Sequence, residues 1–198
     1  YFTATASNIG YGWWSHDIGG HMLGIRSDVM EARWYELGTF SPINRLHSTK
    51  MSFSGKEPWN FRPEVEHAMG EALRLRHQLL PYLYTMNYLA YKEYRPVIAP
   101  MYYDYPENEQ AYPVQAHSFV EGVSNNQYLF GTDMIVAPIT SDQIASLNQG
   151  KVKAWIPEGC YHDFFTGLIY KGEKVMWMFR GINSIPVLVK AGGIIPMQ

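Results

Sequence analysis

The sequence has a single cysteine, Cys160, among its 198 residues. One cysteine cannot form a disulfide within the chain, so a disulfide-stabilised scaffold is excluded, and we expect a reducing, cytoplasmic location. No apolar run reaches the roughly 18 to 20 residues that a membrane-spanning helix needs, so we expect no membrane partner. The net charge is only -2, with 16 basic and 18 acidic side chains, which argues against nucleic acid as a partner.

Aromatic residues are abundant, at 15% of the chain, with 15 Tyr and 6 Trp. Aromatic rings fill protein cores, and their faces can also stack on sugar rings. Hydrophobic residues make up 46% of the chain and charged residues 17%, which is typical of a globular protein with a core. A chain of this length is expected to form one or two domains.

The first 130 residues alternate between strand-like and helix-like segments. The aromatic run at 11–14 predicts a strand that leads into a loop. Residues 27–38 predict a helix, because Asp28 and Glu31 have the spacing of a capping box and Gly38 follows as a stop. Residues 39–61 are rich in Ser, Gly and Pro and predict a long loop, of the kind that is usually functional in a compact domain.

A second helical pattern begins at Pro63 and runs to about Tyr94. Proline suits a first-turn position, where its missing N–H costs nothing, whereas Pro81 inside the pattern predicts a kink. Residues 96–106 then predict another strand. The order of strand, helix and strand is typical of a parallel α/β layout.

The pattern changes near residue 128, where short apolar runs begin to follow one another closely. Glycine, proline, asparagine and aspartate separate these runs, which predicts an all-β module of the sandwich type. We place the boundary within 120–133, which divides the chain into an α/β part, 1–130, and a β part, 131–198. A closed (β/α)₈ barrel needs about 250 residues, so the α/β part is either a small open sheet or the end of a larger barrel.

Residues 13–21, "WWSHDIGGH", gather many residue types that functional sites use. A metal site on His16, Asp17 and His21 lacks the fixed geometry of two histidines four apart on a helix. A phosphate loop would open a helix directly, but seven residues separate Gly20 from the predicted helix. The third interpretation is a sugar pocket built from carboxylate, imidazole and aromatic groups.

Seven blocks in order resemble glycoside hydrolase family 31, over essentially the whole chain. The blocks are "GWWSHDIGGH", "RW..LG.FSPINRLHS", "EPW.F", "LRHQLLPYLYT", "QYLFGTDMIVAPI", "WIPEGCYHDFFTG" and "IPVLVKAGGIIPM". The resemblance implies the last two βα units of a TIM barrel followed by a β-sandwich-type domain. It also implies a retaining α-glycosidase, with an α-glucosidase favoured. An α-xylosidase and a non-catalytic carbohydrate-binding fragment remain the alternatives.

The family's two catalytic motifs, which carry an aspartate nucleophile and an aspartate acid/base, do not occur in the sequence. We therefore expect no catalytic residue in this chain and no activity from it alone. A retaining glycosidase needs two carboxyl groups about 5 to 5.5 Å apart. Asp28 and Asp104 are possible companions of Asp17, but no spacing rule puts either at that distance.

The resemblance implies a binding role for four residues of the chain. Asp17 and His47 are expected to hold the non-reducing-end sugar by hydrogen bonds. His21 stands where the family usually has a phenylalanine that packs on the sugar, and Trp14 is a candidate for stacking. Arg45 is expected to anchor the loop through a carboxylate. We expect a carbohydrate partner, no cofactor or metal, and self-association or pairing with the rest of a longer protein.

Overall fold

The computed structural model describes residues 1–20, 25–50, 52–112 and 126–198. Helices come first and a mostly antiparallel β part follows, in the order that the sequence predicts. The α-helices are α1 (Phe2–Thr5), α2 (Asp28–Thr39), α3 (Pro63–Gln78) and α4 (Leu80–Glu93). The strands are β1 (Ile98–Pro100), β2 (Tyr128–Phe130), β3 (Met134–Val136), β4 (Gly150–Ile156), β5 (Cys160–Asp163), β6 (Ile169–Lys171), β7 (Lys174–Arg180) and β8 (Val187–Lys190). No described helix is both long and apolar enough to cross a membrane.

Helix α2 is present as predicted, but both of its ends differ from the prediction. Ser27 is the N-cap, and its Oγ accepts the backbone N–H of Met30 at 3.3 Å. Glu31 consequently lies one residue beyond the capping-box position, and its side chain turns inward. Gly38 does not end the helix, which continues to Thr39. A Cβ at Gly38 would lie only 2.5 Å from Ile18 Cδ1, so the glycine permits close packing.

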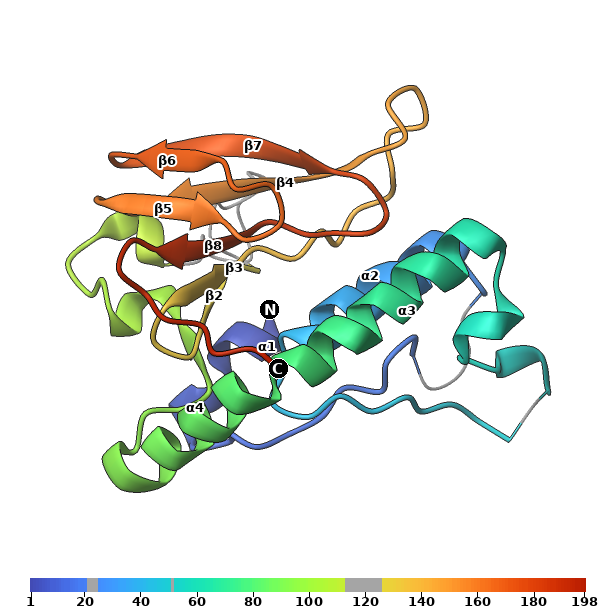
Figure 1. The fold of residues 1–198 in the computed structure, drawn as a ribbon, viewed down its shortest axis with the longest axis horizontal. Coiled ribbons are helices and arrows are strands. Elements are labelled where there is room, and N and C mark those ends of the chain that lie inside the picture. Colours follow the sequence, from blue (N-terminus) through green and yellow to red (C-terminus); the bar gives the residue numbers. More distant parts are fainter. Residues whose placement is uncertain (21–24, 51, 113–125) are drawn as a thin grey trace.

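The predicted kink at Pro81 is a complete break between two helices. Helix α3 ends at Gln78, and α4 starts at Leu80 with Pro81 in its first turn. Proline has no N–H for a bond to the preceding turn, and its ring collides with that turn, so a new helix begins there. Pro63 occupies the first turn of α3, as predicted. The break lets α3 pack beside α2 while α4 runs under the sheets (Figure 1).

The parallel α/β character of the chain lies in two short segments on either side of α2. Isolated parallel bridges join Ser15 to Ile43 and Ile18 to Leu46. The predicted loop at 39–61 therefore contains the second parallel segment. The sequence predicted that residues 96–106 form the next strand of a parallel layout. This was wrong, because the strand in that range, β1, pairs antiparallel with β2.

The β part consists of two antiparallel sheets. The larger sheet has the strand order β1-β2-β3-β8-β5-β6, and the smaller sheet pairs β4 with β7. Successive residues of the larger sheet point to opposite faces, and both faces are buried at β1, β2 and β3. Tyr128 and Phe130 face the helices, where they pack with residues of α4, whereas Leu129 faces the smaller sheet. The result is a layer of helices, a six-stranded sheet and a two-stranded cover (Figure 1). The predicted division after residue 130 stays a prediction.

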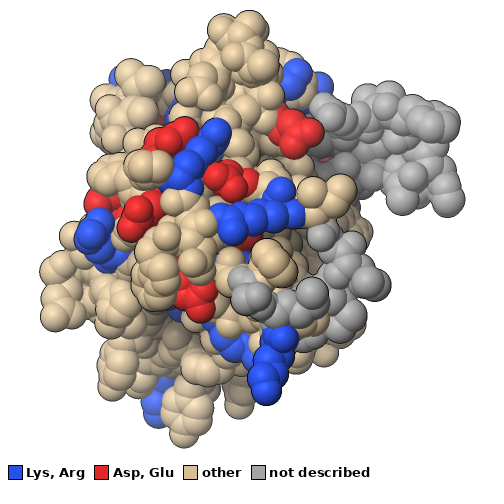
Figure 2. Space-filling model, turned by 90° about the vertical axis from the view of Figure 1, so that its right-hand side faces the viewer, with Lys and Arg blue, Asp and Glu red and all other residues tan. Residues whose placement is uncertain are grey.

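The surface carries charges of both signs close together. On the face that Figure 2 shows, Lys and Arg side chains lie beside Asp and Glu side chains. Arg62 illustrates this mixing, since its Nε lies 3.6 Å from Asp28 Oδ2 and 3.1 Å from Glu64 Oε1. Mixed pairs of this kind create no extended field of one sign.

Candidate functional site

The segment that carries the candidate residues alternates between buried and more exposed side chains. Trp14, His16 and Ile18 are buried, whereas Trp13 is exposed and Asp17 is partly exposed. This alternation is what an extended segment produces when one of its faces packs on a core. Asp17 therefore lies on the face opposite to the core.

Asp17 meets Arg45 where the two parallel segments end. Arg45 Nη2 donates to Asp17 Oδ1 at 2.7 Å, and the Arg45 side chain is exposed. The expectation that Arg45 binds a carboxylate is confirmed. Because Ile18 pairs with Leu46 in parallel, Asp17, Arg45 and His47 occupy the face opposite to this pair. His47 is half-buried there.

Trp14 lies on the other face of the segment, away from Asp17. Its indole contacts Phe2 edge-on at 5.2 Å and the His16 ring at 4.3 Å between centroids. It also borders a cavity of about 450 Å³ between the N-terminal residues and α2. The structure thus brings Asp17 and His47 to one face and Trp14 to the opposite one. His21 lies outside the described residues.

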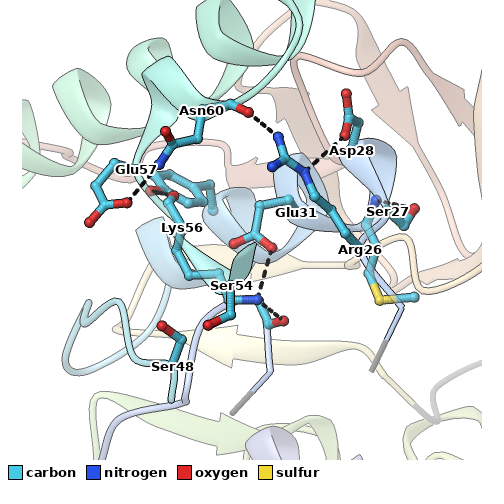
Figure 3. Close-up of polar contacts among 12 residues, drawn as sticks. Arg26, Ser27, Asp28, Glu31, Ser48, Ser54, Lys56, Glu57 and Asn60 are labelled. Carbon is cyan, nitrogen blue, oxygen red and sulfur yellow. Dashed lines mark hydrogen bonds and ion pairs between the residues drawn. The ribbon is translucent and has the colours of Figure 1, made fainter. Parts of the chain in front are cut away.

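The chain turns sharply directly after Asp17. Gly20 donates its N–H to Asp17 O at 2.8 Å, and Gly19 and Gly20 have φ values of 82° and 80°. Side chains other than that of glycine are strained in this region. Lys56 Nζ donates to Gly19 O at 2.7 Å. The same Nζ is 3.6 Å from Glu31 Oε2, and Figure 3 shows the two side chains beside each other.

His16, a candidate metal ligand in the sequence, points into the core. Among the described residues, no group of three His, Cys, Asp or Glu side chains is arranged to hold a metal ion. His16 Nε2 is 2.9 Å from Ser41 Oγ, and the Ser41 hydroxyl is itself 2.6 Å from Leu37 O. Ser41 therefore donates to Leu37 and accepts from His16, so His16 is engaged in the core. Burial lowers the pKa of His16 to about 4.

Lys56 and Glu31 are the residues of this region that the sequence analysis missed. Glu31 is 5% exposed, and its pKa is raised because burial outweighs the attraction of Lys56. The sequence gives no signal for this role, because the spacing of Asp28 and Glu31 indicates a capping box and the burial of Glu31 appears only in the structure. Once buried, such a carboxylate needs a cation nearby. Lys56 and Gly19 are 37 positions apart in the sequence, so no local pattern reveals their contact.

Two family models together match nearly the whole chain. The model described as the glycosyl hydrolases family 31 TIM-barrel domain matches residues 2–86. The model described as the glycosyl hydrolase family 31 C-terminal domain matches residues 94–195. The first matched range ends within α4, and the second contains all eight strands of the described part of the chain.

Individual relatives agree with these two models. The chain is 28% identical to neutral alpha-glucosidase C of Mus musculus over 98% of its own length and 20% of that protein. It is also 28% identical to an alpha-xylosidase of Saccharolobus solfataricus, over 95% and 24% of the two chains. Its fold matches the cycloalternan-forming enzyme from Listeria monocytogenes, in complex with a pentasaccharide substrate, with a TM-score of 0.85 and 27% identity over 98% and 18% of the two chains. The chain thus spans about a fifth of the length of these proteins.

Proposed function

Because the chain belongs to glycosyl hydrolase family 31, we propose that it forms one side of the sugar pocket of a longer α-glycosidase. In this proposal, the parallel segments at 15–18 and 43–46, each followed by a helix, are the last two βα units of the catalytic barrel. The β part lies behind the barrel as a sandwich-type domain. The catalytic carboxylates belong to an upstream part of the same protein.

The observation that carries the proposal is the Asp17 carboxylate held by Arg45 on the face shared with His47. An ionised carboxylate offers about four acceptor positions, so it can accept from Arg45 and from sugar hydroxyls at the same time. The Arg45 guanidinium binds one of the two carboxylate oxygens, Oδ1. Charge-assisted hydrogen bonds are worth about 1.5 to 3 kcal/mol each. Those that shorten in the transition state raise the rate as well as the affinity.

We propose an α-linked glucose as the terminal sugar, hydrolysed with retention. Support comes from the names of the relatives, one a neutral alpha-glucosidase and one bound to a pentasaccharide. An alpha-xylosidase among the relatives makes the matching xyloside the comparison substrate, since it lacks the hydroxymethyl group of glucose. His21 is the residue to exchange for this comparison. His21→Phe keeps a stacking surface, and we expect it to shift the preference among α-glycosides by about 1 to 3 kcal/mol.

Asp17→Asn in the full-length protein tests the proposal. The variant keeps the side-chain shape but removes the charge, so kcat/KM for aryl α-glucosides should fall about tenfold to a hundredfold. The loss should shrink for deoxy-sugars that lack the hydroxyl bound by Asp17, and it should not depend on the leaving group. Asp104→Asn is the matched control, because Asp104 also pairs with an arginine, Arg95, at 3.0 Å.

Two results would contradict this assignment. One is a kcat/KM for Asp17→Asn equal to that of Asp104→Asn. The other is a covalent label on Asp17 after treatment with a mechanism-based α-glucosyl fluoride and peptide mapping. Such a label would make Asp17 the nucleophile instead of a binding group.

A further inference from the structure

The turn that follows Asp17 has little rigidity of its own. Its two glycines, Gly19 and Gly20, both have positive φ, and glycine retains more backbone freedom than any other residue. One backbone hydrogen bond, from Gly20 N to Asp17 O, closes the turn. Between the turn and Asp17, Ile18 donates its N–H to Arg45 O at 3.4 Å, which holds the backbone on that side. The two glycines need a further contact from outside the turn to hold the other side in one position.

Lys56 supplies such a contact and is itself fixed at both ends. Its Nζ donates to Gly19 O at 2.7 Å, and its side chain is 16% exposed. Its backbone carbonyl accepts the hydroxyl of Tyr35 at 2.6 Å, and Tyr35 is fully buried on α2. A lysine held in this way spans from the helix to the turn with little freedom to move.

Glu31 completes the arrangement from beneath the turn. It lies one helical turn before Tyr35, so both side chains are on the same face of α2. A Cβ at Gly19 would collide with the Glu31 carboxylate, which shows how closely the turn lies on this side chain. Glu31 Oε2 is 3.6 Å from Lys56 Nζ (Figure 3). The other oxygen, Oε1, is buried and has no hydrogen-bond partner within the described part of the chain.

A buried pair of this kind is poor evidence for stability, because desolvation of two charges offsets their attraction. A carboxylate oxygen without a partner adds a further cost. A well-packed apolar pair of similar size would hold the helix to the loop as firmly. It could not, however, donate a hydrogen bond to the carbonyl of Gly19. The hydrogen bond from Lys56 to the Gly19 carbonyl therefore gives a reason for a charged pair at this position.

We propose that Lys56 and Glu31 are positioning residues that fix the Gly19 carbonyl and thereby set the place of the Asp17 carboxylate in the sugar pocket. This inference rests on the proposed function. Lys56 donates to the turn, Glu31 keeps the ammonium beside it, and neither contacts the sugar. A displacement of a binding group by about 1 Å is enough to cost about a hundredfold in rate.

The test is a double-mutant cycle in the full-length enzyme with an aryl α-glucoside. We expect Lys56→Met to lower kcat/KM about tenfold and Lys56→Arg to restore at least half of the activity. In the Asp17→Asn background, Lys56→Met should change kcat/KM less than twofold, because the group that it positions is already lost. Lys151→Met is the matched control, since it removes the same charge from β4, where Lys151 lies 4.5 Å from the Trp177 ring.

Hydrogen exchange of the segment at 15–20 gives a readout that does not depend on activity. The Gly20 amide, which is bonded to Asp17 O, should exchange faster in Lys56→Met than in the parent or in Lys151→Met. If Lys56→Met does not fold, Glu31→Gln takes its place in the cycle, since it keeps the shape of the side chain and removes its charge.

The outcomes separate this inference from the proposed function. If Asp17→Asn lowers kcat/KM and the Lys56→Met loss is the same in both backgrounds, Lys56 acts independently of Asp17 and the inference is overturned alone. Unchanged exchange at 15–20 also overturns the inference. If Asp17→Asn has no effect, the proposed function is overturned, and the inference with it.

Discussion

At the scale of single residues, burial decides what His16 can do. The ring donates to Ser41 and packs against two tryptophans, Trp14 at 4.3 Å and Trp34 at 5.7 Å between ring centroids. A charged imidazolium in this place would lose its hydration, and its hydrogen-bond partner is the neutral hydroxyl of Ser41. Burial accordingly lowers the pKa of His16 to about 4. The adjacent Asp17 is partly exposed and paired with a cation, so two neighbouring residues take opposite roles.

This lowered pKa predicts how stability depends on pH. The unfolded chain binds a proton at His16 near its ordinary pKa of 6.5, whereas the folded chain does not until about pH 4. The contribution of His16 to stability is therefore present above pH 6.5 and is lost as the pH falls from 6.5 to 4, by about 3 kcal/mol at most. An NMR titration should show no protonation of the His16 ring between pH 7 and 5. A midpoint near 6.5 would contradict the prediction.

At the scale of elements, two arginines fasten segments that are far apart in the sequence. Arg33 on α2 donates to Ser184 O at 2.7 Å and to Gly181 O at 2.9 Å, which ties the helix to the connection between β7 and β8. Arg76 on α3 donates to Thr39 O at 2.9 Å and to Pro42 O at 2.8 Å. Arg76 thus caps the carbonyls at the end of α2 and holds the start of the segment that leads to His47.

Arg76→Met should destabilise the fold by about 3 kcal/mol, because it leaves several carbonyls without a donor and removes a cation from a helix C-terminus. Arg74→Met is the matched control two residues earlier on the same helix. Arg74 forms an exposed pair with Glu71 at 2.6 Å, so its loss should cost less than about 1 kcal/mol. Urea unfolding of both variants measures the difference. Equal losses would show that the cap contributes nothing beyond a surface charge.

At the scale of the whole molecule, the helical part presents two parallel segments where its family builds a barrel. In the described part of the chain, residues 15–18 and 43–46 pair with each other through isolated bridges. Helix α4 and the six-stranded sheet share one core, in which the Tyr82 hydroxyl donates to Phe130 O at 2.9 Å. The parallel segments also pack on the helices through Ile18 and Leu46, but among the described residues isolated bridges are the ladder pairing that they make.

We expect the isolated 198-residue chain to self-associate and to hydrolyse no aryl α-glucoside at any pH. Unpaired strand edges invite pairing with other chains, and the motifs that carry the family's catalytic carboxylates do not occur in the sequence. Sedimentation velocity and a glycosidase assay on chain purified free of host enzymes measure the two expectations. A monodisperse monomer with one cooperative melt would contradict the first, and measurable turnover would contradict the second.

The sequence by itself determined the features that depend on near neighbours. Pro63 marks the start of α3, and the apolar runs after residue 128 correspond to most of the strands. The block around Asp17, together with the others, was sufficient to identify the family. These signals are readable because helix periodicity, first-turn prolines and motif spacing act over a few residues.

The tertiary structure alone decided which distant segments meet. Strands β2 and β3 are buried on both faces, so their apolar runs carry no alternation that could assign a face or a partner. The contact between Lys56 and Gly19 joins residues 37 positions apart. Likewise, β1 at 98–100 pairs with β2 at 128–130. Such contacts depend on how all the elements pack together, and a local pattern contains no record of that packing. For the same reason, the sequence marked Asp17 but not the residues that hold it in place.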